Sequence, residues 1–231
     1  MKLDVFISGE IIDLCIPTRE FAEKSNWYSW LNDPKIARYT LKRAFPNTPA
    51  LQVDFLEKQQ KEGALPLIIS NKKDYLGVVT LSVIDYIKRV AGISIIVDSS
   101  MDVLRSPLIA LESIARISEH GFQVLGLDRI HGGQHINLAA GWQQRMELLG
   151  YRAEGFKRQL FVKGREVVDV IWIAAIYKDY LTIIKNRGQY WDSAKKMEER
   201  IKRLPKNKYV DSLREFMDKD GELYYKQIFS L

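Results

Sequence analysis

The segment from 129 to 170 constrains the fold of this chain more than any other part of the sequence. Residues 129–131 are expected to form a short strand, followed by a helix over 138–149. Gly150 directly after that helix is a typical C-terminal cap. The turn residues Lys163-Gly164-Arg165 then predict a hairpin between two strands. Strand, helix and hairpin in this order predict one end of a mixed α/β sheet.

The sequence before this segment supplies the rest of such a sheet. Thr18 is expected to cap a first helix, and Asn32-Asp33-Pro34 to close it, because a residue before proline avoids the helical region. A second helix is expected over 49–63, with Leu51, Phe55, Leu56 and Gln59 on one face. The full expected order is strand 11–16, the two helices, strands 67–70, 77–84 and 90–97, helix 107–122, strand 129–131, helix 138–149 and two strands ending near 175.

Beyond Tyr177 the pattern becomes helical and predicts an extension. We therefore divide the chain into a sheet-containing domain, 1–177, and a helical C-terminal extension, 178–231. The extension holds 13 basic and 9 acidic residues, so it carries +4 of the net charge of +6. Its apolar residues are expected to pack on the parent domain, with docking of a protein partner or a homodimer as the alternative. Those residues are Tyr209, Leu213, Phe216, Met217, Tyr224, Tyr225 and Phe229, and the expected helices are 180–184, 192–204, 209–218 and 223–229.

Composition limits the surroundings and partners of the chain. The single cysteine, Cys15, excludes an internal disulfide framework and favours a reducing, cytoplasmic location. It lies in an apolar run, so we expect a buried structural thiol. The sequence has no apolar run near the ~20 residues that span a membrane. It also has no nucleic-acid-binding motif with recognisable spacing, so the basic charge is interpreted as a solvated helical surface.

Three local patterns, taken together with the element order, resemble one family. They are Trp30-Leu31-Asn32-Asp33-Pro34; Leu81-x-x-Ile84-Asp85 followed by Ala91-Gly92-Ile93; and Leu149-Gly150-Tyr151-x-x-Glu154-Gly155 with Gly164, Arg165 and Asp169. Over about residues 8 to 177 the chain resembles the GNAT superfamily of N-acetyltransferases. The branch it resembles acetylates ribosomal-protein N-termini, spermidine and nucleotide-linked amino sugars. The resemblance implies a largely antiparallel central sheet, flanked by helices and splayed between the fourth and fifth expected strands.

The resemblance implies acetyl-CoA as co-substrate. In the family the pantetheine arm pairs with the free backbone edge of the fourth strand, here 95–97. The pyrophosphate binds backbone N–H groups where the next helix begins, at a loop that contains glycines. On this basis the residues expected to contact acetyl-CoA are Ile95, Ile96, Val97, Met101, Asp102, Val103, Leu104, Arg105, Ser106 and Asn137.

The loop itself departs from the family pattern. Asp102 stands where the family has Arg or Gln, and Val103 and Arg105 stand where it has glycine. A carboxylate beside a pyrophosphate is repulsive, and a β-branched residue adopts a positive φ only at a cost. Arg105 would compensate in part by pairing with a phosphate. The loop is therefore either degraded or rebuilt.

Catalytic candidates are few. The base position that some members fill with Glu on the fourth strand is here Gly92. His131 is the expected base, because an unperturbed imidazole titrates near pH ~6.5; a histidine hydrogen-bonded at a strand end is the alternative. His131 and His135 form a poor metal site, since no Cys or carboxylate pair lies nearby in the sequence. Gly132-Gly133 is expected to be a flexible loop. The expected catalytic residues are His131, Asn137 and Glu154.

The acceptor side is expected to involve the first helix and the loop after it. In relatives this region roofs the acceptor site, and aromatic faces suit a sugar ring or a methylene chain. Arg38, Lys42 and Arg43 would suit a phosphate-bearing acceptor, so a nucleotide-linked amino sugar is favoured over other primary amines. Burial of Trp27 and Trp30 in the core of the first helix is the competing interpretation. The expected acceptor contacts are Trp30, Arg38, Tyr39 and Asp85.

Two functions remain open from the sequence. The first is an enzyme that moves an acetyl group from acetyl-CoA to a primary amine of a small molecule or a protein N-terminus. The second is a non-catalytic domain of the same fold, whose helical extension engages a protein partner. The missing loop glycines and carboxylates favour the second, whereas the complete order of elements favours the first.

Overall fold

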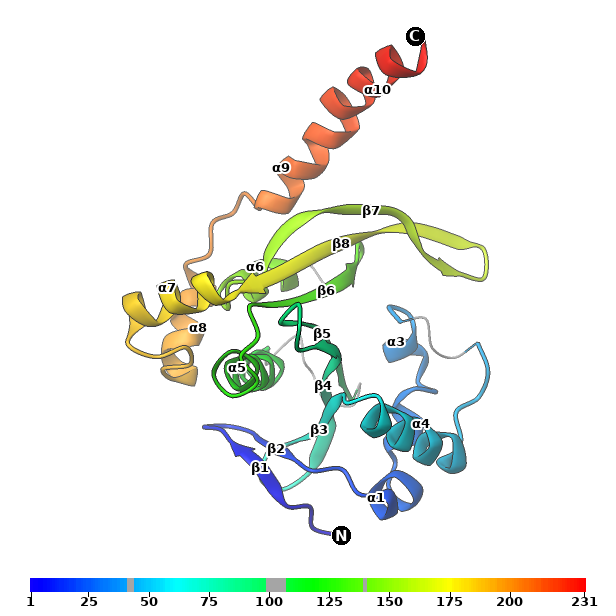
Figure 1. Ribbon diagram of the computed structural model, residues 1–231, viewed down its shortest axis with the longest axis vertical. Helices are drawn as coiled ribbons and strands as arrows, with labels where there is room; N and C mark the ends of the chain where they lie inside the picture. The colour runs from blue at the N-terminus through cyan, green and yellow to red at the C-terminus, as the bar shows by residue number, and fades with distance from the viewer. Residues whose placement is uncertain (41–43, 99–106, 139–140) are drawn as a thin grey trace.

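A single mixed sheet forms the centre of the molecule, with helices against both faces (Figure 1). The computed structural model describes residues 1–40, 44–98, 107–138 and 141–231. Its eight strands lie in the order β1-β2-β3-β4-β5-β6-β8-β7. Only the β5–β6 pair is parallel among the pairs described, which confirms the expected mixed, largely antiparallel sheet. The strands are β1 Val5–Ser8, β2 Asp13–Cys15, β3 Leu65–Ser70, β4 Tyr75–Asp85, β5 Val90–Val97, β6 Arg129–His135, β7 Arg152–Lys163 and β8 Glu166–Ile176.

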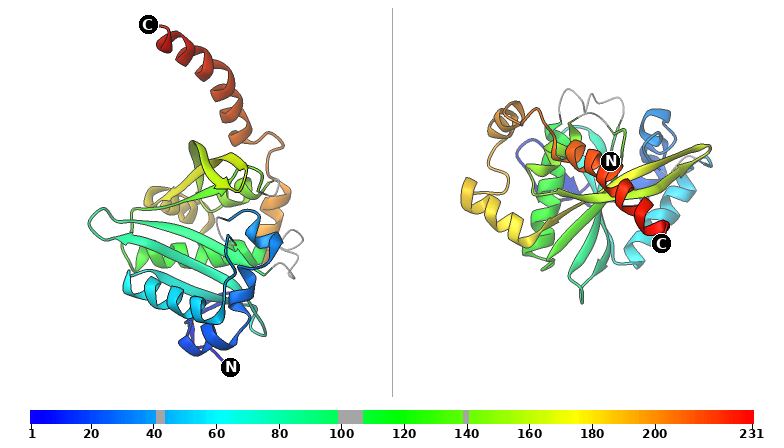
Figure 2. Two further views of the ribbon diagram at one scale, coloured as in Figure 1. Left: turned by 90° about the vertical axis from the view of Figure 1, so that its right-hand side faces the viewer. Right: turned by 90° about the horizontal axis from the view of Figure 1, so that it is seen from above.

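The two faces of the sheet bury different helices, because side chains alternate along each strand. Val79 and Leu81 pack in the cluster that includes α5, whereas Val78 and Ile68 pack in the cluster that includes α1 and α4. Figure 2 shows these helical layers from two further directions. The helices are α1 Arg19–Lys24, α2 Trp27–Trp30, α3 Pro34–Ala37, α4 Pro49–Lys61, α5 Leu108–Gln123, α6 Trp142–Glu147, α7 Tyr177–Arg187, α8 Ala194–Lys202, α9 Tyr209–Phe216, a π-helical turn η1 Met217–Gly221, and α10 Glu222–Phe229.

The first helical region was expected to be a single helix, but it consists of three short helices. Thr18 caps α1 as expected, since its Oγ1 accepts a hydrogen bond from Phe21 N at 3.1 Å. Ser25 then ends α1 in an extended conformation. The Asn-Asp-Pro pattern closes α2, as predicted, but it also opens α3: Asp33 Oδ1 accepts from Lys35 N at 2.7 Å, and Pro34 occupies the first turn.

Helix α4 is correctly placed and Leu56 is buried as expected, but the rest of its buried face differs from the expected one. Thr48 caps it, and Gln52, Val53 and Leu56 are its buried residues. Leu51 is 51% exposed. The buried Gln52 is held by a hydrogen bond from Asn47 Nδ2 to its Oε1 at 2.9 Å. A polar residue therefore occupies a core position that hydrophobic periodicity assigned to an apolar one.

The expected Gly132-Gly133 loop is part of strand β6, which continues to His135. Both glycines pair with β8, opposite Ile173 and Trp172. A Cβ at Gly133 would lie 2.8 Å from a Val170 methyl group, closer than van der Waals contact permits. Glycine is present here because a neighbouring side chain approaches the strand closely, and not because the backbone turns.

Gly150 closes the turn that follows α6, as predicted. Its φ of +81° is in the left-handed region that favours glycine. A Cβ there would also lie 3.2 Å from the Cβ of Asp179 in α7. Helix α6 is shorter than expected, at Trp142–Glu147, and the following residues to Gly150 form turns. The glycine thus ends one helix and lets another pack against the turn.

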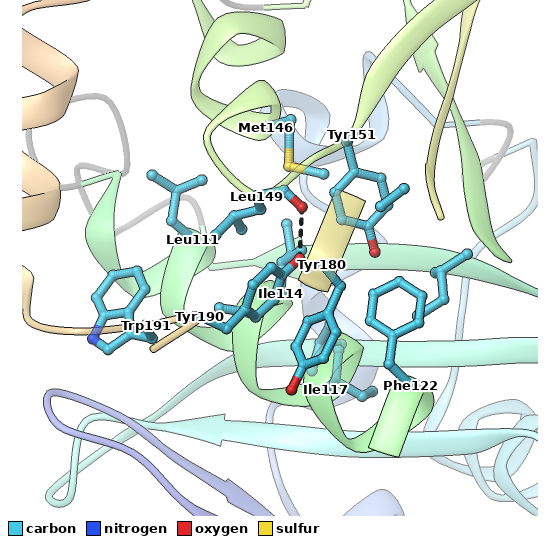
Figure 3. Packing of buried hydrophobic residues seen from close by; sticks show 14 of the residues in the cluster. Leu111, Ile114, Ile117, Phe122, Met146, Leu149, Tyr151, Tyr180, Tyr190 and Trp191 are labelled. Carbon is cyan, nitrogen blue, oxygen red and sulfur yellow. Dashed lines mark hydrogen bonds between the residues drawn. The ribbon is translucent and has the colours of Figure 1, made fainter. Parts of the chain in front are cut away.

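The first half of the extension is built into the core, as Figure 3 shows for Tyr180, Tyr190 and Trp191. Tyr190 is fully buried, and its hydroxyl donates to Leu149 O at 2.6 Å. Trp191 Nε1 donates to Glu10 Oε2 in the turn between β1 and β2 at 3.0 Å. Residues of α7 and α8 therefore belong to the same hydrophobic cluster as the sheet.

The second half of the extension projects away from the body, which overturns the expectation that its apolar residues pack on the parent domain (Figures 1 and 2). Helices α9 and α10 run on through η1 as one long rod. Val210 at its base is buried, whereas Phe216 is 59% and Phe229 79% exposed.

Cys15 is buried in the cluster of α1 and α4, as expected for a structural thiol. Burial, with a smaller contribution from Asp13, raises the pKa of its thiol, so it stays protonated at neutral pH. In the described parts of the chain, no helix combines the length and the apolar character that crossing a membrane requires.

Candidate active site

Strands β5 and β6 separate after a short paired segment, as the predicted splay requires. The parallel pairing joins Val90, Ala91 and Gly92 to Arg129, Ile130 and His131, and among the described residues it goes no further. Strand β5 continues to Val97, paired on its other side with β4. Its backbone edge from residue 93 to 97 therefore faces the gap between the strands.

The side chains of this edge are occupied on both faces of the sheet. Ile95 and Val97 pack against the cluster of α5, and Ile96 packs against the cluster of α1 and α4. All three were expected to contact acetyl-CoA. Only their backbone groups are placed to meet an extended ligand arm lying in the gap, as the resemblance implied.

The end of β5 is fixed by Trp30. Its Nε1 donates to Asp98 Oδ2 at 3.0 Å, and Asp98 N donates to Leu76 O at 2.6 Å. Trp30 is 2% exposed, so it supports the strand end from the core and has no free ring face for an acceptor. The expected loop residues Met101, Asp102, Val103, Leu104, Arg105 and Ser106 lie outside the described residues.

Helix α5 begins directly after that loop, with Pro107 before its first residue, Leu108. Its sixteen residues direct a helix dipole with its positive end toward the loop. The backbone N–H groups in the first turn of a helix have no acceptor within the helix. The start of α5 is therefore a place that favours an anionic group, and its contact with a pyrophosphate stays a prediction.

His131 lies on the face of the sheet opposite α5, at the last paired position before the gap. It is paired to Gly92 on one side and to Ala174 of β8 on the other. Its ring packs against Trp172, with ring centroids 5.1 Å apart. Its Nδ1 is buried and, within the described structure, has no hydrogen-bond partner. A buried nitrogen without a partner is costly in a structural role and useful in a proton acceptor.

The surroundings of His131 keep its imidazole neutral. Burial lowers its pKa, and the positive charges of Arg129 and Lys157 lower it further, against the opposite effect of Glu154. Lys157 lies over the Trp172 ring, with Nζ 3.2 Å from its centroid. A neutral imidazole with a free nitrogen is the form that accepts a proton.

Glu154, an expected catalytic residue, is held by Arg129. Arg129 Nη1 donates to Glu154 Oε1 at 2.6 Å, and Nη2 donates to the other carboxylate oxygen. This pairing lowers the pKa of Glu154. Both oxygens are thus occupied by one guanidinium, and the carboxylate acts on His131 through its charge.

His135, which the sequence offered as a further polar candidate and as part of a poor metal site, lies four residues beyond His131 on the same face of β6. Its Nδ1 accepts a hydrogen bond from Asn137 N at 3.1 Å, and its Nε2 is 3.4 Å from Glu166 Oε1. Edge-on contacts with Tyr39 and Phe161 enclose the ring, at centroid distances of 5.3 and 4.4 Å. The contribution of Asn137 shown here is thus a backbone donor to His135.

The segment after α3, which the sequence predicted as a roof over the acceptor, contacts this face through Tyr39. The Arg38 guanidinium lies 5.5 Å from the centroid of the Tyr39 ring. Lys163, in the β7–β8 hairpin, donates to the carbonyls of Ala37 and Thr40, the latter at 2.9 Å. The segment after α3 and the tip of the hairpin therefore meet, and Tyr39 reaches His135 beneath them. Lys42 and Arg43 lie outside the described residues.

Asp85, an expected acceptor contact, lies at the hairpin turn between β4 and β5. Its Oδ1 accepts from Ile87 N at 3.0 Å and from Lys88 N at 2.8 Å, and bonding to Lys88 lowers its pKa. It pairs with Val90, at the opposite end of β5 from the open edge. This carboxylate shapes the turn.

A cavity of about 340 Å³ adjoins the C-terminal end of β6. It is enclosed by β6, the start of α6, β7, β8 and the base of α9. Gln143 Oε1 is buried at this place and, among the described side chains, has no partner. Its lining combines amides, aromatic rings and cations: Gln134, His135, Ile136, Asn137, Leu138, Gly141, Trp142, Gln143, Phe156, Ile171, Lys208, Val210, Asp211 and Arg214.

Sequence reasoning missed Lys157, Trp172 and Glu166 as parts of this site. Each lies in a strand that was predicted, but their positions depend on bulges in β7, between Ala153 and Gly155 and between Lys157 and Phe161. The sequence contains one sign of the second bulge. Asp169 was singled out there, and its Oδ1 accepts a hydrogen bond from Gln159 N inside that bulge at 2.8 Å. A bulge shifts which residues share a face, so alternation alone misplaces them.

No protein-family model matches the sequence, and no curated protein sequence does. Solved structures do match. A Mycobacterium smegmatis RimJ in complex with CoA-disulfide is 16% identical, covering 77% of this chain and 90% of its own, with a TM-score of 0.65. A Vibrio cholerae spermidine N-acetyltransferase in complex with CoA and spermine is 19% identical, covering 74% and 98%, with a TM-score of 0.65.

A third structure is the microcin C7 self-immunity acetyltransferase MccE in complex with acetyl-CoA and AMP. It is 22% identical, covering 73% of this chain and 93% of its own, with a TM-score of 0.59. Likeness at this level of identity shows a shared fold. The chain therefore has the GNAT acetyltransferase fold, as the sequence resemblance implied.

Proposed function

We propose that this chain is an acyl-CoA-dependent N-acetyltransferase that moves the acetyl group of acetyl-CoA to a primary amine. The observation that carries the proposal is the position of His131. Its unpartnered Nδ1 lies at the point where β5 and β6 separate, beside the free backbone edge of β5. Buried, reduced Cys15 fits a cytoplasmic enzyme.

Each part of the site has a role in this reaction. The edge of β5 binds the extended pantetheine arm, and the start of α5 binds phosphate. The amine nitrogen attacks the thioester carbonyl, the C–S bond breaks and the thiolate of CoA leaves. The proton that the amine must lose passes to His131 Nδ1, directly or through one water. Trp172 and Lys157 keep the imidazole in place and neutral.

The acceptor is proposed to be a small molecule with an anionic group, such as a nucleotide-linked amino sugar. Arg38 and Tyr39 offer a cation and an aromatic face above His135. The cavity beside β6 adds the amides of Gln134 and Gln143 and the guanidinium of Arg214. Amides and rings suit a sugar, and guanidinium suits phosphate. Polyamines and protein N-termini are the competing acceptors.

A second function, a non-catalytic ligand-binding or scaffold domain, is favoured by one observation. Glu154 is held on both oxygens by Arg129, and Gly92 occupies the strand position next to His131. On this reading the site binds a ligand without turning it over, and the projecting helix engages a protein partner.

Two measurements on the full chain separate these functions. Calorimetric titration with acetyl-CoA, and with CoA as reference, tests the cleft. Release of free thiol in the presence of a panel of amines tests turnover, with a nucleotide-linked amino sugar, spermidine and an alanine-initiated peptide as acceptors. Binding with turnover supports the enzyme, and binding without turnover supports the second function. No binding at millimolar acetyl-CoA would refute the enzyme and favour the scaffold role, with the projecting helix as the place to search for a partner.

His131→Gln tests the base. The rate is expected to fall by about 100-fold or more, because a positioned general base contributes ~10²–10⁴. His120→Gln is the matched control, since His120 is also partly buried with a lowered pKa but lies on α5 against Phe6. Equal losses in the two variants would remove His131 from the reaction.

The pH profile provides an independent readout. Because the pKa of His131 is lowered, its neutral form persists below the ordinary value of ~6.5. The rate is therefore expected to stay level from pH 8 to below 6.5 and to fall only in more acid solution. A fall centred above pH 7 would contradict the assignment of His131 as the base.

A further inference from the structure

Only the base of the rod formed by α9, η1 and α10 packs on the body, where Val210 is buried and α9 contacts β7; the rest of the rod projects away (Figure 2). Its interactions are local: Lys219 Nζ contacts Glu215 Oε1 at 2.6 Å, and the Tyr225 ring contacts Tyr224 and Phe229. Most helical stability in proteins comes from burying an apolar face, and the large apolar residues of this rod are exposed.

One side of the rod is apolar throughout. We define the tail stripe as Tyr209, Leu213, Phe216, Met217, Gly221, Tyr224, Tyr225, Ile228 and Phe229. Four of its positions, 213, 217, 221 and 225, follow one another in steps of four. Steps of four drift around an α-helix of 3.6 residues per turn, but the π-helical turn η1 has a wider turn and takes up the difference. The π turn thus keeps both halves of the stripe on one side.

The apolar area is large enough for a stable interface. Five aromatic rings of the rod are between 50% and 79% exposed. At about 200 Å² a ring they offer roughly 600 Å², and the aliphatic residues add to this. A standard interface buries about 800 Å² on each partner. The rings are Tyr209, Phe216, Tyr224, Tyr225 and Phe229.

The charges of the rod argue against lipid or nucleic acid as its partner. From Tyr209 to the end of the chain there are three basic and five acidic residues. A helix that lies on an anionic membrane carries Lys and Arg on its polar side, and nucleic acid requires an excess of positive charge. Here Arg214 pairs with Asp218 at 3.7 Å, so the charges are largely paired within the helix.

We infer that the tail stripe is a dimer interface, and that its partner is the tail stripe of a second copy of this chain. An uncharged stripe is complementary to itself, and a two-fold contact uses the same patch on both copies. A Cβ at Gly221 would meet nothing in its own chain closer than Phe216 O, at 3.8 Å, so the rod itself does not require glycine there, and its small size leaves room for a second backbone. The bodies stay apart, so both clefts remain open in the dimer.

The mass of the full chain in solution tests this inference. Light scattering during gel filtration at about 50 μM is expected to give twice the chain mass of 26.8 kDa. The double variant Phe216→Glu, Tyr225→Glu is expected to be monomeric, because it places charge in the interface. Leu223→Glu is the matched control: Leu223 is equally exposed but lies two residues from Tyr225, on the other side of α10, and its variant should remain a dimer.

Cross-linking identifies the contact directly. Under mild oxidation Gly221→Cys is expected to form covalent dimers, whereas Leu223→Cys is not; the natural Cys15 is buried and does not interfere. A monomeric parent chain at 50 μM would overturn the inference. So would a dimer that survives Phe216→Glu, Tyr225→Glu, since that dimer would use another surface. None of these outcomes depends on acetyl transfer.

Discussion

The two halves of the C-terminal extension are similar in composition, but most aromatic rings of the first half are buried and those of the second half are exposed. Residues 177–205 and 209–231 are both helical and both rich in aromatic side chains. In the first half, Tyr180, Tyr190 and Trp191 are at most 2% exposed. In the second half, Phe229 is 79% exposed. Aromatic content by itself therefore did not decide which half joined the core.

Polar partners on the body distinguish the halves. The turn after α6 presents two carbonyl groups, and Arg187 binds Leu148 O at 2.7 Å while Tyr190 binds Leu149 O. Glu10 receives both Trp191 Nε1 and Ala194 N. A buried Tyr or Trp needs such an acceptor. The first half docks where the body supplies acceptors, and the second half extends beyond them.

The largest expected effect comes from removing a docked ring. Tyr190→Ala should lower the free energy of unfolding by about 3–5 kcal/mol, because it leaves a cavity in the core and an unpaired Leu149 carbonyl. Urea unfolding followed by circular dichroism measures it. Tyr190→Phe keeps the ring and should lose only about 1–2 kcal/mol. A loss below 1 kcal/mol for Tyr190→Ala would mean that this half is not part of the core.

Gly150→Ala should cost about 2 kcal/mol, because the new Cβ meets Asp179 at 3.2 Å and φ is positive. Gly188→Ala is its matched control. Gly188 has a φ of +84°, but a Cβ there meets nothing within 4 Å, so only the backbone cost of about 1 kcal/mol remains. Thermal melts compare the two. Equal losses would show that close packing of α7 on Gly150 is unimportant.

Asp192→Asn should cost about 2 kcal/mol near neutral pH. Arg200 contacts both carboxylate oxygens, at 2.6 and 2.5 Å, and this lowers the pKa of Asp192 to about 2. The depressed pKa stabilises the fold fully above the unfolded value of ~3.9. This contribution is lost as pH falls from about 4 towards 2, so the difference from the parent chain should disappear there. A difference that persists at pH 2 would point to lost packing.

The exposed ion pair of the rod provides the opposite case, with the smallest expected effect. Glu215→Gln removes the partner of Lys219, but both side chains are well exposed. Such pairs contribute about 0–1 kcal/mol. The melting temperature should therefore change little, and less than for Asp192→Asn under identical conditions. A comparable loss would show that the rod is buried in a larger assembly than a pair of helices.

Within the first 177 residues, local chemistry predicted more than packing did. The sequence correctly predicted Thr18 as a cap, Gly150 as a helix end and Gly164 at the hairpin. Each of these roles depends only on residues nearby in the chain. Gly132 and Gly133 were misread, because the atoms that require them belong to other strands.

The candidate site was predictable only in part for the same reason. His131 was proposed as the base because it lies on a strand whose counterpart in the family could be recognised from the sequence. Its lowered pKa depends on burial and on the charges of Arg129 and Lys157, and the bulge in β7 between Ala153 and Gly155 sets the face on which Lys157 lies. Glu154 was placed near the site, but its pairing with Arg129 could not be read from spacing.

The sequence by itself determined the alternation of helices and strands from the second helix onward, several of their ends and the resemblance to one fold, because caps, turns and hydrophobic periods act over a few residues. The tertiary structure decided the rest. It set the point where β5 and β6 part, the unpartnered nitrogen of His131, and the docking of one half of the extension and not the other. These depend on contacts between residues far apart in the chain, whose free energy no local pattern records.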